Sequence, residues 1–88
     1  MPAGDSHAAM QRATRPLKRS FAIKGHRTSI SLEAPFWEAL QQAASLENST
    51  LSGLIATIDA ARGDAGLSSA VRVWILDYFR KRSSPTPR

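Results

Sequence analysis

The chain has 88 residues, of which 42% are hydrophobic, and this fits one small domain near the lower size limit for a chain with its own core. There is no cysteine, and the two histidines, His7 and His26, are isolated, so disulfides and thiolate catalysis are excluded and no metal site is expected. No segment approaches the roughly 18 apolar residues of a membrane span, and no apolar stretch at the N-terminus resembles a signal peptide. We therefore expect a cytoplasmic protein that does not enter a membrane.

The net charge is +5, and the charges are segregated along the chain. Lysine and arginine dominate residues 1–27, acidic residues dominate 28–66, and basic residues return at the C-terminal end. A basic segment ahead of a more acidic body indicates a polyanionic partner, either nucleic acid or an anionic membrane surface. A solubilising tail is the simpler alternative.

The N-terminal residues 1–17 are small, polar and basic, and they are predicted to form a flexible arm. In residues 18–27, "KRSFAIKGHR", Phe21 and Ile23 alternate around Ala22. This segment is either a short extended lead-in that turns at Gly25 or a part of the arm that packs two apolar side chains.

A strand is predicted over residues 28–32. Thr28, Ile30 and Leu32 would point to one face and are apolar or β-branched. Arg27 and the two serines, Ser29 and Ser31, would point to the other face, where each can form hydrogen bonds.

Three helices are predicted after the strand. The first, over residues 33–48, has Pro35 in its first turn, and the second, over 51–62, has Ser49 or Thr50 as its N-cap. Gly53 weakens the second helix and predicts a close crossing of two helices. The third helix, over 67–82, starts with a serine cap and is apolar over more than half its circumference. The apolar stripes and the strand together predict a core or dimer interface formed by Ile30, Leu32, Trp37, Leu40, Leu54, Ile55, Ile58, Trp74 and Tyr78.

The predicted fold class is mainly α with one β-strand. The domain spans residues 18–82, and residues 83–88 form a flexible tail. A lone strand leaves backbone N–H and C=O groups unpaired on both edges. No hairpin partner is predicted inside the chain, so we expect the strand to pair antiparallel with its own copy in an intertwined homodimer.

Such a two-stranded ribbon fits the major groove of double-stranded DNA. Arg27, Ser29 and Ser31 would then face the bases, and backbone N–H groups at Leu51 and Ser52 with the Thr50 hydroxyl would hold phosphates. Lys18, Arg19 and Lys24 would contribute phosphate contacts that are blind to sequence. The alternatives are a solvated strand-end charge for Arg27, a local hydrogen bond for His26, and a merely hydrated ribbon face for the serines.

The stretches "KRSFAIKGHRTSISLEAPFWEAL", "LIATIDAAR" and "LSSAVRVWILDYFR" resemble a bacterial branch of small ribbon-helix-helix domain proteins over roughly residues 18–80. The superfamily includes Arc and MetJ. The resemblance implies a dimeric, non-enzymatic DNA-binding regulator of transcription without a cofactor, whose fold carries an extra C-terminal helix. It also implies base contacts from Ser29, Ser31 and Glu33 and phosphate contacts from the turn at Thr50, Leu51 and Ser52. Glu33 departs from the expected chemistry, because a carboxylate repels phosphate and accepts only from a donor such as cytosine N4.

A second hypothesis is an interaction module. The broad apolar circumference of residues 70–79 indicates a protein partner on the third helix, as in a scaffold or an antitoxin-like protein. An enzyme is the weakest option, because the sequence shows no supported nucleophile cluster, carboxylate pair or glycine-rich phosphate loop.

Overall fold

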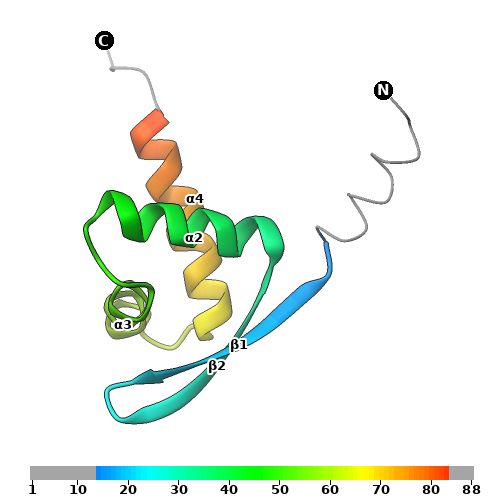
Figure 1. Cartoon of the computed structure of the whole chain (residues 1–88), viewed down its shortest axis with the longest axis vertical. Coiled ribbons are helices and arrows are strands. Elements are labelled where there is room, and N and C mark those ends of the chain that lie inside the picture. The colour runs from blue at the N-terminus through cyan, green and yellow to red at the C-terminus, as the bar shows by residue number, and fades with distance from the viewer. Residues whose placement is uncertain (1–13, 84–88) are drawn as a thin grey trace.

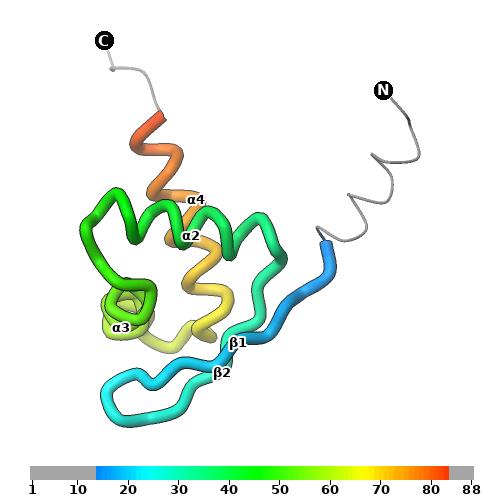
Figure 2. Tube along the Cα trace, in the orientation of Figure 1, coloured from blue at the N-terminus to red at the C-terminus, as the bar shows by residue number. Residues whose placement is uncertain are grey.

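The computed structural model of the protein describes residues 14–83, so most of the predicted arm and tail lie outside the described residues. A β-hairpin comes first, and three helices follow it (Figure 1). The elements are β1 (Pro16–Ile23), β2 (His26–Glu33), α2 (Ala34–Leu46), α3 (Leu51–Ala61) and α4 (Leu67–Ser83). The trace in Figure 2 shows α2 crossing α4, with the hairpin along one side of the helices.

The strand predicted at residues 28–32 has its partner within the same chain. β1 and β2 pair antiparallel, from Pro16 opposite Glu33 to Ile23 opposite His26. Lys24 and Gly25 form the two-residue turn with φ of 51° and 81°, as a type I′ hairpin turn requires. The expectation that this strand lacks a partner inside the chain is therefore wrong, and the intertwined pairing of two copies is not shown.

The physical reason for this difference lies in β1 and the turn. Most of β1 is exposed, so the strand carries charged residues where a half-buried strand would show apolar alternation. Its first two residues, Pro16 and Leu17, fall in the segment predicted as a flexible arm, and they are paired with β2 instead. Lysine is also uncommon at positive φ, so "KG" is a weak turn signal compared with Asn-Gly or Asp-Gly.

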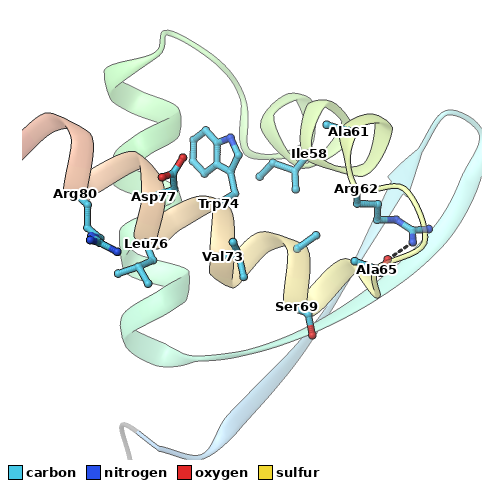
Figure 3. Close-up of a pocket in the computed structure, with 11 residues that line it drawn as sticks. Ile58, Ala61, Arg62, Ala65, Ser69, Val73, Trp74, Leu76, Asp77 and Arg80 are labelled. Atoms are coloured by element: carbon cyan, nitrogen blue, oxygen red, sulfur yellow. Dashed lines mark hydrogen bonds between the residues drawn. The ribbon is translucent and has the colours of Figure 1, made fainter.

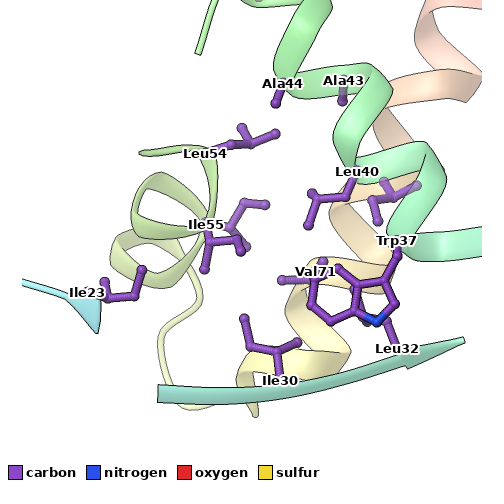
Figure 4. Packing of buried hydrophobic residues seen from close by; sticks show 12 residues of the cluster. Ile23, Ile30, Leu32, Trp37, Leu40, Ala43, Ala44, Leu54, Ile55 and Val71 are labelled. Atoms are coloured by element: carbon purple, nitrogen blue, oxygen red, sulfur yellow. The ribbon is translucent and has the colours of Figure 1, made fainter. Parts of the chain in front are cut away.

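The core lies between the inner face of the hairpin and the three helices (Figure 4). Every element contributes buried apolar side chains to it. These are Ile23, Ile30, Leu32, Trp37, Leu40, Ala43, Ala44, Leu54, Ile55, Ile58, Val71 and Ile75. Trp74 and Tyr78, which the sequence places in the core or at a dimer interface, are half-buried and pack against the edge of the core.

The start of α3 explains the glycine at position 53. Thr50 is the N-cap, and its Oγ1 accepts a hydrogen bond of 2.9 Å from the Gly53 backbone N–H. A Cβ atom on Gly53 would lie 3.0 Å from Thr50 Oγ1 and 3.1 Å from Ser49 Oγ. The close approach at Gly53 is to the cap hydroxyls and not to another helix, which corrects the sequence-based expectation.

The longest helix, α4, ends with three basic residues in its last turn, Arg80, Lys81 and Arg82. Within residues 14–83, no helix is both long enough and apolar enough to cross a membrane.

Candidate nucleic-acid interface

The hairpin has an outer face that points away from the helices. The antiparallel register places Lys18 opposite Ser31, Ser20 opposite Ser29, and Ala22 opposite Arg27 on this face. All of these residues except Ser31 are exposed, and Ser31 is half-buried. Ser20 Oγ and Ser29 Oγ lie 3.3 Å apart across the two strands. The outer face is therefore polar and basic. Lys18 and Arg27 contribute two cations, and Ser20, Ser29 and Ser31 contribute three hydroxyls.

Arg19 lies on the inner face of the hairpin, because it is paired with Ile30. Its guanidinium carbon lies 5.0 Å from the ring centroid of Trp37 and 5.7 Å from that of Phe21. Trp37 Nε1 also donates a hydrogen bond of 2.9 Å to the Leu17 carbonyl. Lys18 and Arg19, which the sequence predicts as equivalent phosphate contacts, thus lie on opposite faces of β1.

The turn end of the hairpin concentrates further polar groups. Lys24, His26 and Arg27 are all exposed there. Gly25 has no neighbouring atom within 4 Å of where a Cβ would be, so this end of the ribbon is open. An approaching ligand can therefore reach the turn without displacing protein atoms of the described segment.

Glu33, at the other end of β2, is engaged by α4. Arg72 Nε donates to Glu33 Oε1 at 3.0 Å, and Arg72 Nη2 donates to Glu33 Oε2 at 3.2 Å. The hydrogen bonds from Arg72, followed by one from the Glu33 backbone N–H, lower the pKa of the Glu33 carboxyl. A base contact by Glu33 would require this fork-shaped ion pair to open.

The backbone of Ser31 is also held by α4. Its N–H donates to Ser68 Oγ at 3.1 Å, and its carbonyl accepts from Arg72 Nη2 at 3.1 Å. The sequence predicts a serine cap at the start of α4, but the Ser68 hydroxyl bonds to the strand. Sequence reasoning missed both α4 residues, because they lie 37 and 41 positions from Ser31 and no local spacing connects them.

The start of α3 offers backbone donors. The first N–H groups of a helix have no partner within the helix, and the Gly53 N–H is taken by the Thr50 cap. The N–H groups of Leu51 and Ser52 remain directed out of the helix start, where the positive end of the helix dipole favours an anion. Thr50 and Ser52 are exposed and Leu51 is half-buried.

Metal chemistry has no visible site in this part of the chain. Within residues 14–83, no three His, Cys, Asp or Glu side chains gather closely enough to hold a metal ion.

One family model and one solved structure are similar to this chain. A family model described as "Ribbon-helix-helix domain" matches residues 16–79. The chain is also similar to the solved structure of an uncharacterized protein from Bordetella pertussis Tohama I, with 28% sequence identity and a TM-score of 0.71. The similarity covers 94% of this chain and 72% of that one. No curated protein matches the chain.

Proposed function

Because this chain belongs to the ribbon-helix-helix domain family, we propose that it is a DNA-binding regulator of transcription that inserts its β1–β2 ribbon into the DNA major groove. The family predicted from the sequence is confirmed by the match over residues 16–79. The observation that carries the proposal is the outer face of the hairpin, which is polar, basic and unobstructed by the helices.

The dimensions of a ribbon support this mode of binding. Neighbouring strands are about 4.8 Å apart, and the major groove is about 12 Å wide, so two strands with short side chains fit inside it. Serine hydroxyls can donate to or accept from base edges, and Arg27 can donate two hydrogen bonds to guanine O6 and N7. A good arginine–guanine pair contributes about 1–3 kcal/mol of discrimination against other bases.

Phosphate contacts would orient the ribbon in the groove. Lys18 and Lys24 are exposed lysines on the outer face and at the turn. The start of α3 adds backbone N–H groups from Leu51 and Ser52 together with the Ser52 hydroxyl. Arg19 is exposed and its guanidinium lies over Trp37, so we assign its main contribution to the packing of the inner face.

Base recognition is assigned to Arg27, Ser29 and Ser31. Glu33 is assigned a different role, because its carboxylate is bound by Arg72 and so fixes the end of the ribbon to α4. The proposed regulator acts as a homodimer, since one hairpin presents a small footprint and specific DNA binding normally needs a larger one.

Fluorescence anisotropy across a salt series tests the proposal. The full chain is titrated onto DNA from upstream of its own gene and onto scrambled DNA of the same length. We expect tighter binding to the native fragment at every salt concentration. Equal affinity for both fragments, vanishing together as salt rises, would contradict sequence reading by the ribbon.

Single substitutions distinguish the base contacts from the phosphate contacts. Arg27→Ala and Ser29→Ala are expected to reduce the preference for the native fragment. Lys18→Ala is expected to weaken binding to both fragments alike. Each lost phosphate contact makes the plot of log affinity against log salt shallower by about 0.9, so the loss of one contact from each subunit of a homodimer changes the slope by about 1.8. Lys81→Ala is the matched control, because Lys81 is an exposed lysine on α4 that pairs with Asp77.

A second candidate function is a module that binds a protein partner, as in a scaffold or an antitoxin. The exposure of Val73 and Leu76 on α4 supports it. A partner that no longer binds when both residues are made polar, with DNA binding unchanged, would favour this candidate over the regulator.

A further inference from the structure

A hollow of about 510 Å³ lies between α3 and α4 (Figure 3). Its volume falls within the roughly 300–1,000 Å³ that is usual for small-molecule sites. Most of its lining is aliphatic, with Ile58 from α3 and Val73 from α4, and the indole of Trp74 adds an aromatic wall. Alanines also line the hollow, and their short side chains leave its interior open; they are Ala61, Ala65 and Ala70. The hollow is therefore an apolar concavity of ligand size.

Two large apolar side chains at this hollow remain in contact with water. Val73 is 67% exposed and Leu76 is 56% exposed, and both line the hollow. Covering such side chains with an apolar group is favourable, because it removes hydrocarbon surface from water. The body of a matching ligand is therefore apolar.

The charged side chains of the hollow differ in whether they are already paired. Arg62 Nε lies 2.6 Å from Asp59 Oδ1, and Asp77 Oδ2 lies 2.9 Å from Lys81 Nζ. Among residues 14–83, the guanidinium of Arg80 has no hydrogen-bond, ion-pair or ring partner. The uncompensated charge at the hollow is thus positive, and the group that complements it is an anion.

The unpaired cation and the apolar lining are arranged in line. Figure 3 shows Arg80 at one end of the hollow and Arg62 at the other, with Val73 and Trp74 between them. A ligand whose anionic end meets Arg80 would therefore extend its apolar part along α4 toward Ile58. A guanidinium presents parallel N–H donors that match the two oxygens of a carboxylate.

We propose that this hollow is a binding site for an aliphatic carboxylate of medium chain length, with the carboxylate at Arg80 and the hydrocarbon chain between α3 and α4. The proposal goes beyond the proposed function, because such binding requires neither DNA nor a second subunit. A small ligand needs only this hollow, whereas a stable protein interface covers about 800 Å² on each partner.

Nuclear magnetic resonance of the full chain tests the site with octanoate as the probe. The chain has two tryptophans, so their indole N–H signals can be followed separately and assigned with Trp74→Phe. We expect the Trp74 signal to shift saturably, with a dissociation constant of about 1 mM or lower. The Trp37 signal is the internal control, because Trp37 is buried in the core. Butanoate is expected to bind at least about 10-fold more weakly, since each lost CH₂ group reduces affinity by about 4-fold.

Two substitutions test the two ends of the site. Arg80→Gln is expected to weaken octanoate binding by about 10-fold and to remove its advantage over 1-octanol. Arg82→Gln is the matched control, because Arg82 is an exposed arginine of the same helix turn that does not line the hollow. Ala61→Phe places a ring at the other end and is expected to abolish binding. Both test positions are exposed, so circular dichroism is expected to show an unchanged helix content.

Defined results would overturn the proposal. One is a Trp74 signal that octanoate does not move, and another is equal binding of octanoate, 1-octanol and octylammonium, which would show apolar adsorption only. A Trp74 signal that moves on dilution without any probe would assign the hollow to a second copy of the chain. A chain that ignores octanoate but loses a protein partner when Val73 and Leu76 are made polar would assign the surface to that partner. No DNA is present in the titration, so failure of the DNA-binding proposal would be seen separately by anisotropy.

Discussion

Arg72 and Glu33 are 39 positions apart in the sequence, and the Arg72 guanidinium donates to both carboxylate oxygens of Glu33, at 3.0 and 3.2 Å. The same guanidinium binds the Ser31 carbonyl and lies 5.9 Å from the ring centroid of Phe36. One side chain therefore fastens the end of the ribbon to α4 and covers the start of α2. This contact acts together with the hydrogen bond between Ser31 and Ser68 and with the packing of Ile30 and Leu32 in the core.

This ion pair predicts a pH dependence of stability. The folded-state pKa of Glu33 is below its ordinary value of 4.5, so the unfolded chain takes up the proton first as the pH falls. The stabilisation is complete above the unfolded pKa and is lost as the pH falls through the lower folded pKa. Urea unfolding is measured between pH 7 and pH 3. The free energy of unfolding is expected to fall less on acidification for Glu33→Gln than for the wild type. Glu38→Gln, at an exposed site on α2, is the control, and an equal effect from both variants would contradict the prediction.

The cap of α3 predicts a measurable loss of stability. Thr50→Ala removes the acceptor of the Gly53 N–H and is expected to reduce the free energy of unfolding by about 1 kcal/mol. Thr50→Ser keeps the hydroxyl and is expected to retain most of the stability. Chemical denaturation of both variants measures the difference, and equal losses would show that the hydroxyl is not the stabilising group.

The turn of the hairpin predicts a substitution that raises the free energy of unfolding. Lys24 has φ of 51°, a region that asparagine tolerates better than lysine. Lys24→Asn is expected to raise the free energy of unfolding by about 0.5 kcal/mol, while Gly25→Ala, at φ of 81°, is expected to lower it by about 1 kcal/mol. Thermal unfolding followed by circular dichroism measures both. Because Lys24 is a proposed phosphate contact, Lys24→Asn is also expected to weaken DNA binding while it stabilises the fold.

The two faces of β1 predict opposite behaviour for adjacent basic residues. Arg19→Ala removes a cation over Trp37 and is expected to shift the tryptophan fluorescence and to lower stability by about 0.5–1 kcal/mol. Lys18→Ala, on the outer face, is expected to leave both unchanged and to weaken DNA binding. Equal loss of DNA affinity from the two variants would show that Arg19 also reaches the phosphates.

The elements with a regular apolar period were predictable from the sequence alone. The spacing of Leu54, Ile55 and Ile58 indicates the buried side of α3, and these residues are buried in the structure. The alternation in Thr28, Ile30 and Leu32 likewise indicates the inner face of β2. Burial of one face produces a periodic pattern of apolar residues in the sequence, because the positions on that face share the same environment.

The contacts that form the candidate site produce no periodic pattern in the sequence, and only the tertiary structure determined them. β1 carries Lys18 and Arg19 because its exposed positions tolerate charge, so its pairing with β2 was not visible as a strand pattern. The roles of Glu33 and Arg72 depend on α4 returning to the end of β2, a long-range approach that no spacing encodes. The sequence determined which apolar residues are buried. The packing of the helices against the hairpin determined which polar residues remain accessible to a ligand.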